Sequence, residues 1–131
     1  DINLAAPFFI SQAFFKKLKP NAQGRIAMML DWRALRPGVD HLPYTISKAG
    51  LAALTKTLAL SMAPRVTVNG IALGAILPPT DNSPDDKLIQ SVPLKRWANL
   101  DELSQAILFL MDGPEYITGE VIHLDGGRHL I

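Results

Sequence analysis

Tyr44 and Lys48 stand four residues apart, in the stretch Tyr44-Thr45-Ile46-Ser47-Lys48. At the start of a helix this spacing places both side chains on one face, so the lysine ammonium can lie near the phenol and favour its ionised form. An unperturbed phenol, with a pKa of about 10, is a poor acid or base at neutral pH, and a nearby cation corrects this. The pair therefore predicts a proton-transferring tyrosine, although the same spacing is also typical of a solvated helix face.

The elements that must position this pair follow from hydrophobic periodicity and turn residues. Apolar residues at helical spacing predict three helices, and the last of them has an asparagine N-cap: Leu4–Leu18, Tyr44–Ala63 and Leu100–Met111 after Asn99. A weaker helix is predicted over Asp85–Gln90. Short apolar or β-branched runs predict three strands, Arg25–Leu30, Val66–Ala72 and Val121–Leu124. Proline-rich loops are expected over residues 31–43 and 73–84.

This alternation of helices and strands predicts an α/β fold, with βαβ units and a doubly wound parallel sheet. The uninterrupted apolar run Arg25–Leu30 suits a strand that is buried on both faces. Tyr44 opens a helix after this strand and its loop, and ligands bind α/β sheets at the carboxyl ends of strands. Three strands alone would leave apolar edges open, so we expect further strands N-terminal to Asp1.

Composition narrows the classes of function. The 131 residues carry 13 basic and 12 acidic side chains, a formal net charge of +1, which indicates no nucleic-acid or anionic-membrane partner. The absence of cysteine excludes disulfides and thiolate metal sites and is compatible with a reducing cytoplasm. No apolar run is long enough to span a bilayer. His41, His123 and His129 have no ligand spacing, so no metal site is expected.

Five motifs resemble the short-chain dehydrogenase/reductase family in order and spacing. They are Asn3-Leu4-Ala5-Ala6-Pro7-Phe8, Gly24-Arg25-Ile26, Tyr44-x-x-x-Lys48-Ala49, Val68-Asn69-Gly70-Ile71-Ala72, and Ile117-Thr118-Gly119 followed by Asp125-Gly126-Gly127. The resemblance implies a Rossmann-type fold in which residues 1–131 form the C-terminal part of a single domain. It also implies that the N-terminal part, which binds the dinucleotide phosphates, is absent from this chain.

The resemblance implies roles for individual residues. Tyr44 matches the proton donor, and Lys48 matches the residue that binds the nicotinamide-ribose hydroxyls and lowers the phenol pKa. Asn3 matches an asparagine that anchors a water in a proton relay, and it is equally suited to cap the first helix. Gly74-Ala75-Ile76 matches the loop whose backbone meets the nicotinamide carboxamide. Leu73 and Pro78 depart from the family pattern at this loop. The implied cofactor is NADP(H), with NAD(H) left open.

Asp31 stands thirteen residues before Tyr44, where the family normally has a serine that holds the substrate carbonyl. An ionised carboxylate cannot donate a hydrogen bond to a carbonyl, but it accepts from ring N–H or amino groups and can help deliver a proton to an imine nitrogen. Aspartate here, His41-Leu42, and the ending Leu124–Leu130 resemble the pteridine reductase branch, which includes the bacterial dihydromonapterin reductases. In the alternative interpretation, Asp31 only caps the loop or pairs with Arg33 or Arg36.

The expected function is NADPH-dependent reduction of a dihydropterin or a similar ring imine, with Tyr44, Lys48, Asp31 and Asn3 as catalytic residues. The alternatives are reduction of a ketone or other carbonyl, and a catalytically inactive fragment that lacks the cofactor-phosphate site. We expect a small-molecule substrate and a cytoplasmic homotetramer. In this family the helices that match Leu4–Leu18 and Tyr44–Ala63 pack against their copies, and here both are apolar around much of their circumference.

Overall fold

The computed structural model describes residues 2–78 and 86–131. Its helices and strands alternate along the chain, and all of the predicted elements are present. In chain order they are α1 (Ala5–Lys17), β1 (Gly24–Asp31), the 3-10 helix η1 (Trp32–Ala34), α2 (Leu42–Met62), β2 (Val66–Leu73), α3 (Asp86–Ser91), α4 (Leu100–Asp112), β3 (Val121–Leu124) and the 3-10 helix η2 (Arg128–Leu130).

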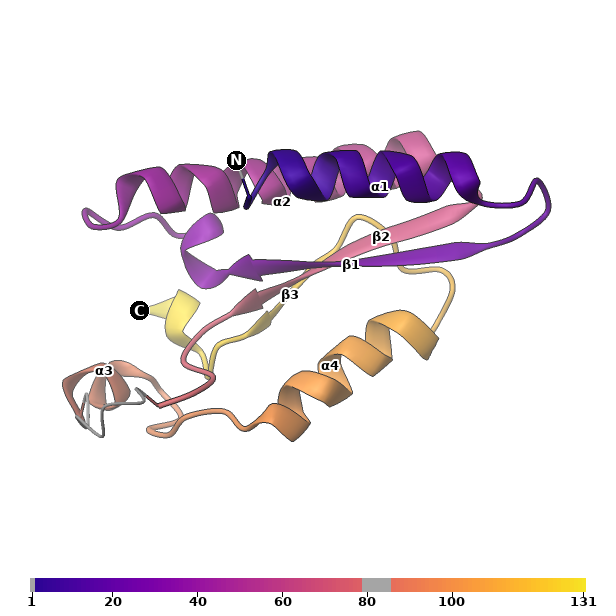
Figure 1. Cartoon of the computed structure of the whole chain (residues 1–131). Helices are drawn as coiled ribbons and strands as arrows, with labels where there is room; N and C mark the ends of the chain where they lie inside the picture. The colour runs from indigo at the N-terminus through magenta and orange to yellow at the C-terminus, as the bar shows by residue number, and fades with distance from the viewer. Residues whose placement is uncertain (1, 79–85) are drawn as a thin grey trace.

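The three strands form one parallel sheet in the order β1-β2-β3. Asp31, the last residue of β1, pairs in register with Leu73 of β2, which pairs in turn with Leu124 of β3. All three strands therefore end at the same edge of the sheet, where η1, η2 and α3 gather (Figure 1). The α/β fold with a parallel sheet is confirmed, and its carboxyl edge brings together segments that are distant in sequence.

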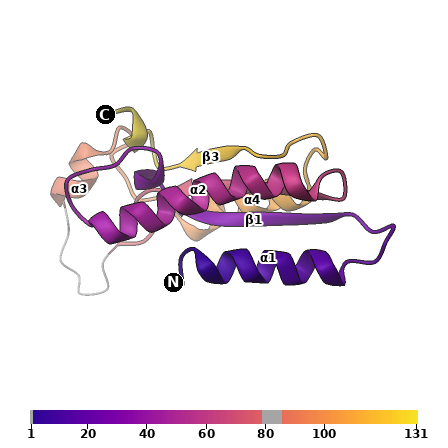
Figure 2. The same cartoon turned by 90° about the horizontal axis from the view of Figure 1, so that it is seen from above.

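Helices cover both faces of the sheet. In Figure 1, α1 and α2 lie on one face and α4 lies on the other, and Figure 2 shows from above that α1 runs alongside α2. The main core forms between α2 and the sheet. Its buried members are Met28, Leu30, Ala34, Leu51, Ala52, Leu58, Ala59, Met62, Val66, Val68 and Ala72. Because α2 packs on the central strand through this core, the start of α2 is held at a fixed position above the carboxyl edge.

Two expectations about the β1–α2 connection need correction. The α2 helix begins at Leu42 rather than Tyr44, since Pro43 occupies the first turn, where its missing N–H costs no helical hydrogen bond. The loop predicted over residues 31–43 contains η1, whose N-cap is Asp31. Tyr44 therefore lies inside the first turn of α2 rather than at its first position.

Burial of β1 is less complete than its sequence predicts. Only Met28 and Leu30 are buried, while the rest of the strand is half-buried. The reason is that, among the described residues, β1 pairs with β2 alone and so forms an edge of the sheet. The central strand β2 fits the expectation better, because six of its eight residues are buried.

The N-terminus of α4 carries the predicted cap. The Asn99 side chain accepts from the backbone N–H of Glu102 at 2.8 Å, and the Glu102 carboxylate accepts from the Asn99 N–H at 2.9 Å. This reciprocal pair is a capping box. Hydrogen bonds from the Arg96 side chain, followed by the Asn99 backbone, lower the pKa of Glu102 to about 2.

The weak helix predicted over Asp85–Gln90 corresponds to α3, and Asp85 itself lies outside the described residues, as does the part of the predicted 73–84 loop from residue 79 onwards. None of the helices described is long and apolar enough to cross a membrane.

Candidate active site

A hydrogen bond between Tyr44 and Asp31 forms the centre of the candidate site. The Tyr44 hydroxyl donates to Oδ2 of Asp31 at 3.2 Å. The fold explains this contact: Asp31 ends β1 at the carboxyl edge of the sheet, and Tyr44 stands in the first turn of the helix that packs on the sheet. Tyr44 is 37% exposed, so the phenol can be reached from solvent. Asp31 and Tyr44, thirteen residues apart in the sequence, are therefore direct partners.

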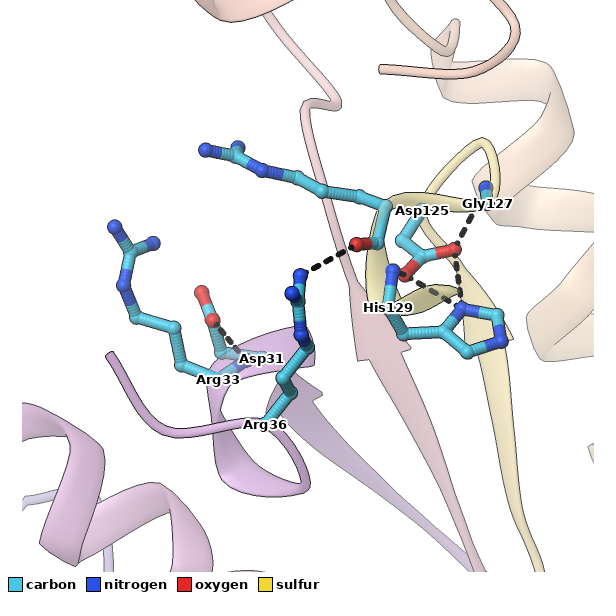
Figure 3. Close-up of polar contacts among 7 residues, drawn as sticks. Asp31, Arg33, Arg36, Asp125, Gly127 and His129 are labelled. Carbon is cyan, nitrogen blue, oxygen red and sulfur yellow. Dashed lines mark hydrogen bonds and ion pairs between the residues drawn. The ribbon is translucent and has the colours of Figure 1, made fainter. Parts of the chain in front are cut away.

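The second oxygen of Asp31 fixes the turn that follows the strand. Oδ1 of Asp31 accepts from the backbone N–H of Arg33 at 2.8 Å and caps η1 (Figure 3). The guanidinium of Arg33 instead donates to Asp40 at 3.0 Å, and that of Arg36 donates to the carbonyl of Arg128 at 3.4 Å. The alternative interpretation of Asp31 is thus half right. The carboxylate caps the loop, but it also contacts Tyr44 and forms no ion pair with either arginine.

Lys48 lies one helical turn after Tyr44. Its ammonium donates to the carbonyl of Met29 at 2.8 Å and lies 5.7 Å from the centre of the Tyr44 ring. Burial lowers the pKa of Lys48, and the charge of Asp31 opposes that shift. The carbonyl contact fixes the ammonium between the end of β1 and the first turns of α2.

The pKa of Tyr44 shifts in the direction opposite to that expected. Burial raises it, and the charge of Asp31 and the hydrogen bond to Asp31 raise it further. The expectation was that Lys48 lowers this pKa. The physical reason for the difference is that the Asp31 carboxylate contacts the phenol oxygen directly, whereas the Lys48 ammonium is bonded to Met29. In this arrangement the tyrosine is held in its neutral, proton-bearing form.

Asn3 and Lys48 line the same hollow, which has a volume of about 330 Å³ and is bounded by α1, β1 and α2. The N-cap of α1 is Leu4, and no side chain of the described residues caps that helix. The interpretation of Asn3 as a helix cap is therefore wrong. Its amide stands beside a space large enough for ordered water, which needs two to four polar partners. Lys48 supplies one such partner in the same hollow.

The segment Gly74-Ala75-Ile76 follows β2 at the same edge of the sheet. The Gly74 N–H donates to the Leu124 carbonyl at 3.0 Å, and the Ala75 carbonyl accepts from the N–H of Ala98 at 3.0 Å. A Cβ at Gly74 would lie only 2.6 Å from the Cα of Asp125. The loop is thus tied to β3 and to the segment before α4, and glycine permits the close approach of the two backbones.

One cluster at this edge, formed by Asp125, His129 and His123, was not predicted from the sequence. Asp125 is buried, and its carboxylate accepts from the backbone N–H groups of Gly127 at 3.0 Å and His129 at 2.8 Å (Figure 3). Its Oδ2 also lies 2.9 Å from Nδ1 of His129, whose ring stacks on His123 at 3.9 Å. The spacing of the histidines in the sequence did not indicate this contact, but β3 and the turn after it bring His123 and His129 together. Within residues 2–78 and 86–131, no group of side chains is suited to hold a metal ion.

Comparison with known proteins places this geometry in a family. Residues 1–129 match the family model described as enoyl-(acyl carrier protein) reductase. The chain is 33% identical over 137 residues to the 3-oxoacyl-[acyl-carrier-protein] reductase FabG of Rickettsia felis, covering 100% of this chain and 57% of that protein. It is 35% identical to FabG of Aquifex aeolicus over 134 residues, covering 96% of this chain and 53% of that protein.

Among solved structures, the chain resembles FolM alternative dihydrofolate reductase 1 from Brucella canis, complexed with NADP. The TM-score is 0.90 and the identity 33%, with 99% of this chain and 52% of that chain covered. The chain thus spans just over half the length of the relatives it matches. Its parallel sheet, the Tyr44 and Lys48 pair and the match over residues 1–129 together show that the chain belongs to the short-chain dehydrogenase/reductase family.

Proposed function

We propose that the protein reduces a carbon–nitrogen double bond in a dihydropterin or similar ring, using NADPH. The observation that carries this proposal is the contact between Asp31 and the hydroxyl of Tyr44. It sets a hydrogen-bond acceptor beside the proton donor, at the position where the family normally has a serine that donates to a carbonyl. A carboxylate suits a ring that presents N–H or amino groups, because each of those groups is a donor.

Reduction of a carbon–nitrogen double bond adds a hydride to carbon and a proton to nitrogen. A nicotinamide cofactor, when bound, supplies the hydride. Tyr44 supplies the proton from its neutral phenol. Asp31 accepts from the ring N–H groups and so orients the acceptor nitrogen toward Tyr44. Asn3, beside the hollow that it shares with Lys48, holds a water that returns a proton to the site after turnover.

The residues present fit the nicotinamide end of such a cofactor. The Lys48 ammonium has three N–H donors, and within the described part of the chain Met29 accepts from one of them. The remaining donors suit a pair of ribose hydroxyls. The backbone of Gly74, Ala75 and Ile76 follows the end of β2. We expect it to contact the carboxamide of the nicotinamide. The preference for NADP(H) over NAD(H) is supported by the Brucella canis relative, which was crystallised with NADP.

A ketone or another carbonyl is the second candidate substrate. It is favoured by the names of the Rickettsia and Aquifex relatives, which are 3-oxoacyl-[acyl-carrier-protein] reductases. Against it stands Asp31, which cannot donate to a carbonyl oxygen while ionised and already accepts a hydrogen bond from the Tyr44 hydroxyl. The Asp31 contact therefore favours the dihydropterin.

Self-association into a homotetramer is part of the proposal. The α1 helix leaves large apolar side chains exposed on more than one side, with Phe9 62% and Ile10 68% exposed, and Ile46 of α2 is 62% exposed. Phe9 and Ile46 line one shared hollow, and exposed apolar patches of this kind mark interaction sites. A second copy that packs α1 and α2 against their counterparts would bury it.

The test compares substrates rather than variants alone. The intact protein is assayed with NADPH on a dihydropterin and on a 3-oxo ester, as the parent and as the Asp31→Ser and Tyr44→Phe variants. We expect the parent to prefer the dihydropterin, Asp31→Ser to shift preference towards the ketone, and Tyr44→Phe to impair both. A parent that reduces only the ketone, with a preference that Asp31→Ser leaves unchanged, would refute the assignment. A parent that turns over neither substrate would support the inactive alternative.

A further inference from the structure

Two arginines stack on Trp32, the residue that follows Asp31, and a third is bonded to one of them. The guanidinium carbon of Arg33 lies 4.9 Å from the centre of the Trp32 ring, and that of Arg128 lies 4.5 Å from it. Arg36 donates to the carbonyl of Arg128 at 3.4 Å. Arg33 and Arg36 come from η1 and the turn after it, whereas Arg128 begins η2. We call Arg33, Arg36 and Arg128 the arginine cluster.

The arginine cluster lies at the edge of the proposed active site. The backbone N–H of Arg33 donates to one carboxylate oxygen of Asp31, and the other oxygen accepts from the Tyr44 hydroxyl. In Figure 3 the side chains of Asp31, Arg33 and Arg36 rise from one turn in the same direction. A substrate held by Asp31 and Tyr44 would therefore extend over the arginine cluster.

Within the described residues, the acidic groups next to the arginine cluster are already paired with basic side chains. The Asp40 carboxylate pairs with the Arg33 guanidinium at 3.0 Å and with the His41 ring at 3.3 Å. The buried carboxylate of Asp125 is bonded to His129. Arg36 is exposed, and within the part of the chain that the structure describes it has a carbonyl partner but no acidic one. Its single contact is long for an N–H···O bond, so its charge is available to a ligand.

Arg33 supplies a second indication. Its side chain is only 19% exposed, and its Nε is a buried donor without a hydrogen-bond partner among the described residues. A buried donor without a partner is costly, because the group has lost its hydration without replacement. Guanidinium groups bind carboxylates and phosphates in paired hydrogen bonds, and an arginine that stacks on an aromatic ring is held in place for this.

We propose that the arginine cluster binds an anionic group carried by the substrate, so that the preferred substrate is an acid. This inference rests on the proposed function. In that proposal the ring of the substrate binds to Asp31 and Tyr44, and the inference concerns the remainder of the same substrate molecule. A carboxylate tail and a phosphate ester share the required chemistry. Binding of the anion raises affinity without taking part in hydride or proton transfer, so its loss raises KM and leaves kcat unchanged.

Two matched pairs of substrates separate this inference from the proposed function. One pair is dihydrofolate, which carries carboxylates, and dihydrobiopterin, which is neutral. The other is a 3-oxo acid and its methyl ester. The pair that the intact protein reduces tests the proposed function, and the ratio of acid to neutral kcat/KM within that pair tests the arginine cluster. A phosphorylated dihydroneopterin, run beside dihydrofolate, distinguishes phosphate from carboxylate.

Arg36→Gln and Arg128→Gln are compared with Lys17→Gln, an exposed cation at the end of α1, beyond the opposite edge of the sheet. We expect each arginine variant to raise KM for the acid about tenfold, as for a partly exposed charged hydrogen bond, and to leave the neutral partner within about twofold. Lys17→Gln should change neither. Equal effects on the acid and the neutral partner, or no effect on either, would overturn the proposal.

Ionic strength gives a readout that does not depend on how the variants fold. The screening length falls from about 10 Å at 0.1 M salt to about 3 Å at 1 M. For the parent protein, kcat/KM on the acid should fall over this range while kcat/KM on the neutral partner stays level. Parallel salt profiles for the two would contradict an anion site.

Discussion

Replacing Asp31 by asparagine tests the site most directly, because the substitution keeps the size of the side chain, removes its charge and turns one acceptor oxygen into an NH2 donor. A hydrogen bond to a charged group is worth about 1.5–3 kcal/mol. Asp31 is half-buried and Tyr44 is 37% exposed, so solvent screens their surroundings and the lower part of that range applies. A loss of about 1.5–2 kcal/mol corresponds to about a tenfold to thirtyfold fall in kcat/KM on a dihydropterin.

The same substitution should move the pH profile. Asp31 raises the pKa of Tyr44 through its charge and its hydrogen bond, in addition to the effect of burial. Removing the charge lowers that pKa, so the phenol loses its proton at a lower pH. The alkaline limb of kcat/KM reports the ionisation of the proton donor in the free enzyme and should therefore shift to lower pH in Asp31→Asn.

The assay is kcat/KM against pH for the intact protein, with a neutral dihydropterin as substrate. Asp40→Asn is the matched control, since Asp40 lies in the same loop and pairs with Arg33 rather than with Tyr44. It should leave the alkaline limb in place. If Asp31→Asn stays within about threefold of the parent, a difference of roughly 0.65 kcal/mol, and its alkaline limb does not move, Asp31 is only a loop cap.

Three further outcomes are expected. Asn99→Ala removes half of the capping box of α4 and should cost about 1 kcal/mol of stability, measured as a lower Tm. Asn99→Asp keeps the acceptor oxygen and should leave the Tm unchanged. Equal Tm values for the two variants would argue against the cap. Gly74→Ala should destabilise the protein by about 1–3 kcal/mol in denaturant unfolding, because its Cβ would lie 2.6 Å from the Cα of Asp125. Gly38→Ala is its control, since the Cβ there meets only a carboxylate oxygen of Asp40 at 3.0 Å. Ile10→Lys should reduce the molar mass of the assembly in light scattering, because it places a charge on an exposed apolar face. A parent protein that is already monomeric at micromolar concentration would contradict the proposed tetramer.

Local patterns were enough to predict the elements. The period of the apolar residues located α4, and Asn99 as its N-cap fixed where that helix begins. The start of α2 was predicted two residues late because Pro43 was interpreted as ending a loop, although proline is also favoured in the first turn of a helix. Both interpretations of Pro43 are consistent with the local sequence.

The site could be predicted only where one segment carried the information. Tyr44 and Lys48 share a helix, so their proximity followed from helix geometry. The direction of the pKa shift of Tyr44 did not follow, since it depends on which of Asp31 and Lys48 contacts the phenol oxygen. Arg128 and Trp32 are separated by most of the chain and meet only because β1 and β3 end at the same edge of the sheet. No spacing in the sequence reports such a contact.

The central position of β2 has a consequence for local unfolding. Its backbone is hydrogen-bonded to β1 on one side and to β3 on the other, and Val68 and Ile71 are completely buried. Opening β2 requires both ladders to separate and the α2 core to break, whereas an outer strand can open by losing one ladder. Amide hydrogen exchange should therefore be slowest in β2. The segment that begins at Gly74 is thus attached to the part of the described sheet that exchanges last.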